Sequence, residues 1–96
     1  MIIKLSPQGG LGDLDVSKRG DVLTINGERF DFRELPEGGV LPGSAVECEF
    51  VSGDVTRIDG ELIITLSLPC GVDSSAAARF PADIVNPPDG NVSLPQ

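Results

Sequence analysis

The side chains that most enzymes use for acid–base chemistry are missing from this sequence. It contains no histidine, tyrosine or tryptophan, so it lacks the usual general base near neutral pH and the best aromatic stacking platforms. A serine nucleophile would need a lysine as its base, but the adjacent Ser17 and Lys18 would point to opposite faces of a strand. Catalysis would have to rest on carboxylates alone, and we expect that the protein is not an enzyme.

Carboxylates could also bind a metal ion, and two short acidic stretches come closest to a calcium loop. They are "GDLD" at 12–15 and "PDGN" at 88–91. Calcium takes about six to eight oxygen ligands from one closely spaced loop, and each stretch supplies too few. The glycine-rich "QGGLGD" at 8–13 lacks the amphipathic helix that follows a phosphate-binding loop. Turn chemistry explains all these stretches, so we predict no metal and no cofactor.

The hydrophobic pattern that must position these side chains has a period of two nearly everywhere. Short alternating segments are separated by turns that contain many of the 12 glycines and 8 prolines, a pattern typical of β-strands. One helical turn is expected near Asp73 or Ser74, which could cap it before Pro81 ends it. The predicted strands are 2–6, 13–18, 21–26, 28–33, 46–51, 54–58 and 61–68, with weaker ones near 83–86 and 91–94.

Two similar stretches locate the predicted turns. "GDVLTINGE" at 20–28 returns as "GDVTRIDGE" at 53–61. Each contains an Asx-Gly pair, which tolerates the two positive φ angles of a type I′ hairpin turn. Each also begins with a glycine that should mark the preceding reversal, so each predicts a three-stranded meander. The predicted turn residues are Gly20, Asn26, Gly27, Gly53, Asp59 and Gly60.

The predicted fold class is all-β: a small antiparallel β-sandwich or barrel built from two three-stranded meanders, with at most one short helical turn. The two stretches share turn chemistry rather than ancestry, because the alignment places Leu14 and Val16 opposite Glu47 and Glu49 and so reverses the inward face. A chain of 96 residues suffices for one domain, 1–96, with one modest core. Residues 87–96 are expected to be a loose tail.

The charge balance and the cysteines narrow the class of protein further. The formal net charge of −8 would repel phosphates, so nucleic acid is not an expected ligand. No apolar run approaches the roughly 20 residues of a membrane span, and the start "MIIKLSP" lacks a signal-peptide pattern. Cys48 and Cys70 are too few for a disulfide scaffold, and we expect two reduced thiols. These features predict a soluble, unexported protein with no membrane partner.

Without evident chemistry, function is expected at surfaces that other proteins can contact. The strand edge at 13–18, with Asp13 and Asp15, is one candidate, because unpaired strand edges invite a partner. The other is the loop "LPEGGVLPGSA", which presents Val40 and Leu41 between prolines and glycines. Homo-oligomerisation is a further expectation.

One short motif suggests a protease. "GVDSSA" at 71–76 resembles the Asp-Ser/Thr-Gly-Ala signature of small aspartic proteases, which are β-rich chains that work as homodimers. The resemblance implies that two Asp73 carboxylates would meet across a dimer axis. However, Ser75 stands where the signature requires glycine, and the second motif of that family has no counterpart. A turn capped by Asp73 is the better interpretation.

A wider resemblance covers the chain from Met1 to about Asp83. The segments "MIIKLSP", "GDVLTINGERFDFRELPEGGVLP", "RIDGELIITLSLP" and "RFP" resemble a family of small uncharacterised proteins of tailed phages and prophages. Because that family is usually encoded among tail or tail-fibre genes, the resemblance implies a tail or tail-fibre protein as partner, and a location in the bacterial host cytoplasm or the virion. Cys70 stands where the family often has histidine, and the longer acidic tail of many members is absent.

These observations lead to two functional hypotheses. The first is a non-enzymatic phage accessory protein that acts through protein contacts, in tail assembly or as a minor tail component. The second is an acidic inhibitor that mimics nucleic acid and occupies a host DNA-binding protein, which the net charge of −8 favours. Mimicry requires carboxylates aligned with phosphate-like spacing. The acids that would have to form this stripe are Asp13, Asp15, Asp31, Glu47 and Glu49.

Overall fold

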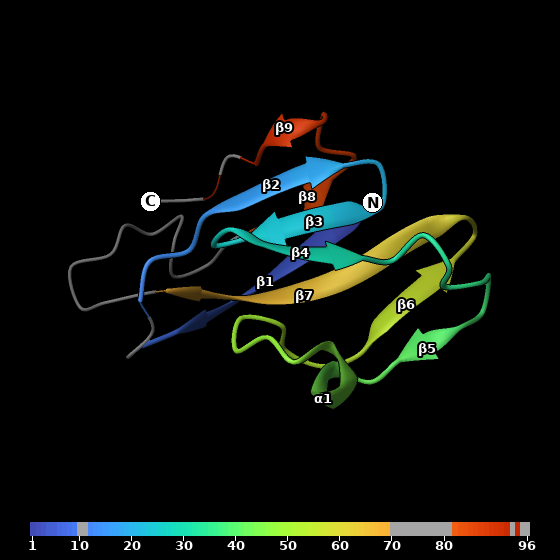
Figure 1. Ribbon diagram of the computed structural model, residues 1–96, viewed down its shortest axis with the longest axis horizontal. Coiled ribbons are helices and arrows are strands. Elements are labelled where there is room, and N and C mark those ends of the chain that lie inside the picture. The colour runs from blue at the N-terminus through green and yellow to red at the C-terminus, as the bar shows by residue number, and fades with distance from the viewer. Residues whose placement is uncertain (10–11, 70–81, 93, 95–96) are drawn as a thin grey trace.

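Two β-sheets pack against each other in the computed structural model, which describes residues 1–9, 12–69, 82–92 and 94. One sheet has the strand order β5-β6-β7-β1-β8 and the other has the order β4-β3-β2-β9 (Figure 1). Inward-facing side chains of both sheets belong to one hydrophobic cluster. The predicted all-β class is therefore confirmed, and the architecture is a sandwich.

The strands are short except for the two at the centre of the larger sheet. The five-stranded sheet contains β5 (Val40–Leu41), β6 (Val55–Ile58), β7 (Glu61–Pro69), β1 (Ile2–Gln8) and β8 (Ile84–Val85). The four-stranded sheet contains β4 (Glu28–Asp31), β3 (Val22–Ile25), β2 (Val16–Arg19) and β9 (Gly90–Asn91). A helical turn, α1 (Gly43–Val46), lies between β5 and β6.

The Asx-Gly pairs form the tips of two hairpins. Asn26 and Gly27, between β3 and β4, have φ angles of 50° and 83°. Asp59 and Gly60, between β6 and β7, have φ angles of 53° and 78°. Both pairs thus have the two positive φ angles of a type I′ turn. Gly20, with φ 59°, begins the reversal between β2 and β3.

Gly53 does not mark a reversal, contrary to its counterpart Gly20. Val51 pairs with Leu66 and Thr56 pairs with Ile63, both in antiparallel orientation. Residues on both sides of Gly53 therefore run along the same edge of β7. Gly53, with φ 79°, lies in a bulge between the two pairings.

The predicted strand at 46–51 is wrong. Residues 43–46 form α1, which ends at Glu47 in the left-handed conformation with φ 58°. Val46 and Phe50 are both buried and lie four residues apart, a spacing that fits a helical turn as well as strand alternation. The second meander instead begins with β5, which pairs with β6. The helical turn expected near Asp73 lies outside the described residues.

The central pair of the larger sheet is parallel, so the scaffold is not antiparallel throughout. β1 and β7 pair from Ile2–Ile63 to Gln8–Pro69. A parallel pair needs a long crossover connection, and here that connection contains β2, β3 and β4 of the other sheet and then β5 and β6 of the same sheet. The hydrophobic pattern could not show this, because alternation is the same for either strand direction.

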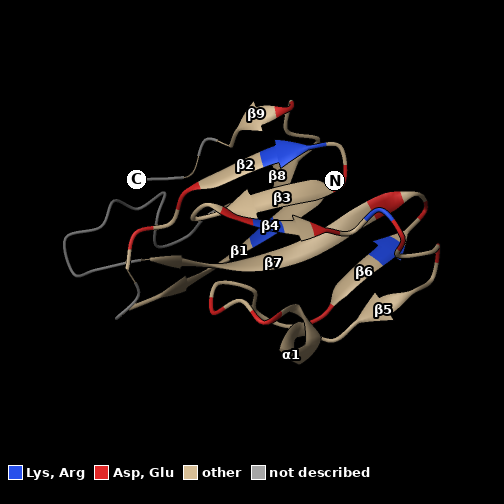
Figure 2. Ribbon diagram, viewed as in Figure 1, with Lys and Arg blue, Asp and Glu red and all other residues tan. Residues whose placement is uncertain are grey.

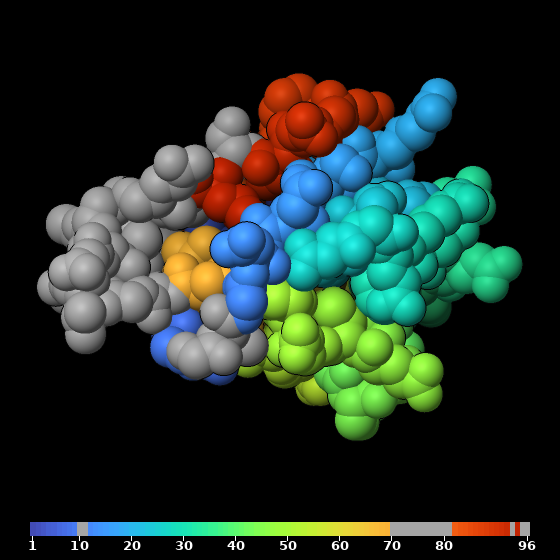
Figure 3. Space-filling model, turned by 60° about the vertical axis from the view of Figure 1, so that its left-hand side comes forward, coloured from blue at the N-terminus to red at the C-terminus, as the bar shows by residue number. Residues whose placement is uncertain are grey.

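The C-terminal segment is fixed on the smaller sheet over part of the predicted loose tail. β9 pairs with β2, and the Val92 N–H donates to the Val16 carbonyl at 2.9 Å. Val92 belongs to the hydrophobic core. In the space-filling view these residues, in red, lie directly against the blue surface of β2 (Figure 3).

The core lies between the sheets. The five-stranded sheet contributes residues at alternate positions of its two long strands, and the four-stranded sheet does the same. The buried side chains include Ile3, Leu62, Ile64, Leu66, Val16, Leu23, Ile25 and Phe32. Burying a large aliphatic side chain stabilises a fold by about 1.5–3 kcal/mol, so this layer is the main stabilising feature.

One charged side chain links the two sheets through the edge of this layer. Arg57 of β6 donates from Nε to the Leu35 carbonyl at 2.6 Å and from Nη2 to the Phe32 carbonyl at 3.2 Å. Its Nη2 also donates to Asp21 Oδ2 at 2.9 Å, and the Arg57 side chain is only 14% exposed. The guanidinium therefore joins β6 to the β2–β3 turn and the end of β4.

Candidate functional site

Asp13 and Asp15 do not lie on an open strand edge. β2 is paired on both sides, with β3 and with β9. The backbone before it is attached to the neighbouring hairpin tip, because the Asp15 N–H donates to Asn26 Oδ1 at 2.7 Å and Asn26 Nδ2 donates to the Asp13 carbonyl at 2.9 Å. The predicted free edge at 13–18 is therefore wrong, although both carboxylates are exposed.

The structure separates the other predicted pair, Val40 and Leu41. Val40 is 57% exposed and pairs with Thr56, whereas Leu41 packs against the core and pairs with the fully buried Val55. Successive residues of a strand point to opposite faces. Only Val40 therefore belongs to an outer surface, which is the outer face of the five-stranded sheet.

Aliphatic side chains form a row across that outer face, interrupted only by Thr56. Pairing places one residue from each strand in the row, and the two ends are the most exposed, Val40 at 57% and Val85 at 61%. Ile58, at 52% exposure, lies beside the row on β6. We call this surface the apolar row, and its members are Val40, Thr56, Ile63, Ile2 and Val85.

This face has few charges. At the outward positions of its five strands the charged residues are Lys4 and Glu61. Glu61 Oε2 accepts a hydrogen bond from the N-terminal ammonium of Met1 at 2.6 Å, so its charge is compensated. A partner that covers the apolar row would therefore bury little uncompensated charge.

The outer face of the four-stranded sheet has the opposite character. A shallow, open basin of about 900 Å³ on this face is lined by three outward-pointing arginines and, at its β9 edge, by Lys18, which extends from an inward position opposite Leu23. Acidic residues, by contrast, are spread over loops and strand ends around the molecule (Figure 2). We call this surface the basic basin, and it is lined by Ser17, Lys18, Arg19, Val22, Thr24, Arg29, Arg33, Asp89 and Gly90.

Two of the four cations already bind carboxylates. Arg33 forms a two-point hydrogen bond with Asp31: its Nε donates to Oδ1 at 2.9 Å and its Nη2 donates to Oδ2 at 2.6 Å. These hydrogen bonds lower the pKa of Asp31 from 3.8 to about 2. Lys18 Nζ and the Gly20 N–H donate to Asp89 Oδ1 at 2.9 and 3.0 Å, which also lowers the pKa of Asp89.

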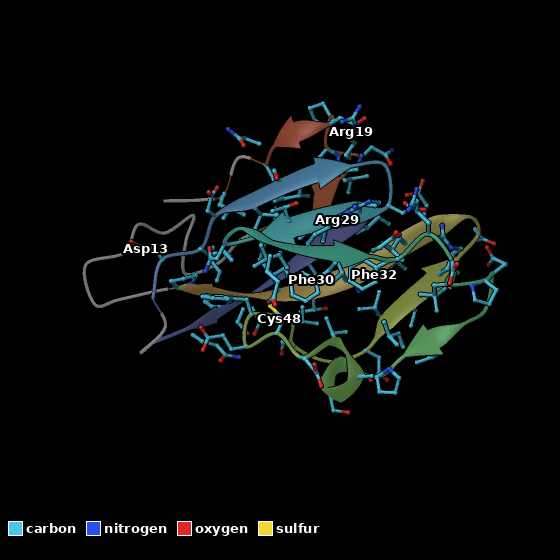
Figure 4. The ribbon with its side chains drawn as sticks, viewed as in Figure 1. Asp13, Arg19, Arg29, Phe30, Phe32 and Cys48 are labelled. Carbon is cyan, nitrogen blue, oxygen red and sulfur yellow. The ribbon has the colours of Figure 1, made fainter. Side chains whose placement is uncertain are left out.

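The other two cations, Arg19 and Arg29, have no carboxylate within ion-pair distance in the described part of the chain. Both are exposed. Figure 4 shows Arg29 over the middle of the four-stranded sheet and Arg19 toward the β9 side, while Phe30 and Phe32 lie on the side of the larger sheet. The basin therefore has two unoccupied guanidinium groups above a floor without aromatic rings.

Sequence reasoning missed the basic basin, although its signal was present. The β3–β4 turn fixes the register that places Arg29 opposite Thr24, and the β2–β3 turn places Thr24 opposite Ser17. The same register places Arg19, Val22 and Asp31 in the next outward row. Applying the two predicted turns to the outward positions would have brought the arginines together.

The described residues show no group of three or more metal-ligating side chains that could hold an ion. No helix among them is long and apolar enough to cross a membrane. Cys48 is a free, half-buried thiol. Cys70 and Asp73 lie outside the described residues, so the structure does not bear on the protease motif.

The two outer faces of the sandwich are thus the surfaces with the most distinct chemistry. One is apolar and poor in charge, and the other collects arginines around bound carboxylates. No protein-family model, no curated protein and no solved structure matches this chain.

Proposed function

We propose that this protein is a non-enzymatic accessory module that binds another protein through the apolar row. The supporting observation is that aliphatic side chains from Val40 to Val85 cross all five strands with only Thr56 among them. A contiguous exposed apolar patch of this kind is typical of an interaction site. Covering each exposed aliphatic side chain would contribute on the order of 1 kcal/mol to binding.

The proposed partner is a tail or tail-fibre protein of a tailed phage, during tail assembly or in the virion. This part of the proposal rests on the resemblance of the sequence segments described above. The β-branched side chains of the apolar row support a protein partner in general, because a sheet or an amphipathic helix of another protein could pack on them. A second copy of this chain is the competing occupant.

The nucleic-acid mimic has less support. Asp31 is bonded to Arg33 and lies beside Arg29, so its negative charge is compensated. Asp13 and Asp15 flank the hairpin tip at the other end of β4, and the remaining two acids follow α1. Mimicry depends on an uninterrupted stripe of uncompensated carboxylates, which favours the protein-binding proposal.

Lysine crosslinking followed by mass spectrometry can test the proposal, because Lys4 lies on the same outer face as the apolar row. Lys4 is exposed at an outward position of the five-stranded sheet, whereas the Lys18 side chain is only 11% exposed and binds Asp89. In lysates of a phage-producing host, we expect Lys4 to crosslink to a tail or tail-fibre protein. A Val85→Asp variant should reduce this crosslink about tenfold, because a carboxylate would be buried in the contact.

The matched control is Asn91→Asp. Like Val85, Asn91 is exposed on a two-residue edge strand, but it belongs to the four-stranded sheet. The control should leave the Lys4 crosslink unchanged. Crosslinks from Lys4 only to a second copy of this chain, or equal losses in both variants, would contradict the proposal.

A further inference from the structure

We propose that the basic basin binds a pair of carboxylates from an acidic, extended segment of a partner protein. The site lies on the face opposite the apolar row, so it is independent of the function proposed above. Three features support this assignment: the ligands that the basin already holds, the spacing of its open arginines, and its floor.

The basin already selects carboxylates from the chain itself. Asp31 accepts a two-point hydrogen bond from Arg33, and Asp89 accepts from Lys18 and from the Gly20 N–H. Each of these cations is neutralised by a carboxylate at 2.6–2.9 Å. Groups that remain free in the same basin have the same chemistry and are available to an external acid.

Arg19 and Arg29 are those free groups, and their positions define the ligand. They lie on β2 and β4 with one strand between them, and Arg19 stands one outward row beyond Arg29. Strands lie about 4.8 Å apart and alternate residues of a strand about 6.8 Å apart, so the two Cα atoms are separated by roughly 12 Å. The flexible arginine side chains can close this distance to that between two carboxylates at alternate residues of an extended peptide.

Beside the arginines, the floor offers further polar contacts. Ser17 and Thr24 lie opposite each other in the same row as Arg29. Each hydroxyl can donate a hydrogen bond to a carboxylate or accept one from a peptide N–H. A guanidinium binds a carboxylate through two parallel hydrogen bonds, so two arginines and two hydroxyls suffice to orient a short acidic segment.

Nucleic acid fits this floor less well. Single-stranded nucleic acids bind by stacking bases on aromatic side chains and by neutralising many phosphates. The lining contains no aromatic residue, and Phe30 and Phe32 pack toward the core instead. A net charge of −8 also opposes a long polyanion more than it opposes a segment with two carboxylates.

The test is the binding of a fluorescein-labelled peptide of alternating Glu and Thr, compared with its Gln and Thr analogue, by fluorescence anisotropy at low ionic strength. The Glu peptide should bind at least about tenfold more tightly, since charge-assisted hydrogen bonds are replaced by neutral ones. Arg19→Gln and Arg29→Gln should each weaken it about tenfold. Addition of salt to 0.5 M should weaken it further, because exposed charges are screened.

Lys4→Gln is the control, since it removes one positive charge from the opposite face. It should change the affinity less than about twofold, because Lys4 lies on the other sheet and cannot form a charge-assisted hydrogen bond with a peptide in the basin. On the unsubstituted protein, amide NMR shifts caused by the peptide should centre on Ser17 and Thr24.

Four outcomes would overturn the assignment. They are equal weakening by Lys4→Gln and Arg29→Gln, no preference for the Glu peptide, NMR shifts confined to another face, and tighter binding of a ten-nucleotide oligothymidylate that competes with the peptide. The last would assign the basin to nucleic acid.

Discussion

The outer faces of the two sheets differ in the chemistry of their side chains. The five-stranded face presents the apolar row, with Lys4 and Glu61 as the charged residues at its outward strand positions. The four-stranded face collects Arg19, Arg29 and Arg33 in one basin. The same pleated geometry underlies both faces, so the difference arises only from which side chains occupy the outward positions.

This difference shows how little a net charge says about a surface. The value of −8 describes the whole chain, yet the basin on the four-stranded face is lined by more cations than carboxylates. The net charge alone predicts the long-range repulsion of polyanions. It does not predict local recognition, which depends on the few groups that a ligand touches.

The largest expected effect is the difference in stability loss between a substitution in the core and one on an outer face. Ile63 and Ile64 are neighbours on β7, but Ile64 is fully buried and Ile63 is a half-exposed member of the apolar row. Ile64→Ala should lower the free energy of unfolding by about 3 kcal/mol through lost burial and a cavity. Ile63→Ala should cost less than about 1 kcal/mol. Urea denaturation measures both, and equal losses would mean that the outer face is covered within the monomer.

The next largest effect is the difference in stability loss between replacing an arginine that links the two sheets and replacing one that lines the basic basin. Arg57→Met should lower the free energy of unfolding by about 2 kcal/mol, because Asp21 and two carbonyls lose their donor. Arg29→Met, on the basic basin, should change it by less than about 0.5 kcal/mol. The same chemical change is made in both variants, and a larger loss for Arg29 would show that the basin is structural.

The smallest effect is a change in titration within the basin. The hydrogen bonds from Arg33 lower the pKa of Asp31 from 3.8 to about 2. Because the folded-state pKa is lowered, this interaction favours the folded state above pH 3.8 and is lost as the pH falls toward 2. The carboxyl carbon resonance of Asp31 should titrate near pH 2, and Arg33→Gln should move it back toward 3.8. An unchanged titration midpoint of Asp31 in the variant would show that Arg33 does not hydrogen-bond to Asp31 in solution.

Local turn chemistry was predictable from the sequence, and long-range pairing was not. Asn26-Gly27 and Asp59-Gly60 both adopt the φ angles that their residue types favour. Gly53 has the same local sequence context as Gly20, yet it forms a bulge because β7 extends past the hairpin and pairs with Val51 as well. The bulge at Gly53 therefore depends on the length of β7, which no local sequence pattern predicts.

Prediction of the candidate surfaces was limited in the same way, because it also depended on which strands pair. Val40 was correctly predicted to be exposed, because it lies between glycine-rich and proline-rich segments. Leu41 was wrongly predicted to be exposed, because only the pairing of β5 with β6 turns successive side chains to opposite faces. The apolar row requires the order of five strands, including the parallel pair that hydrophobicity cannot reveal. The basic basin required only the register of two tight turns, so it was within reach of the sequence.

The parallel pairing of β1 with β7 has a consequence for how the chain folds. β1 forms no contact with its main partner until residues 61–69 exist, so during synthesis it must wait while about sixty residues emerge from the ribosome. The three-stranded meander β2-β3-β4 can form earlier from neighbouring residues. Non-local pairing of this kind slows folding to milliseconds or longer, and closure of the central sheet is expected to be the last and slowest step.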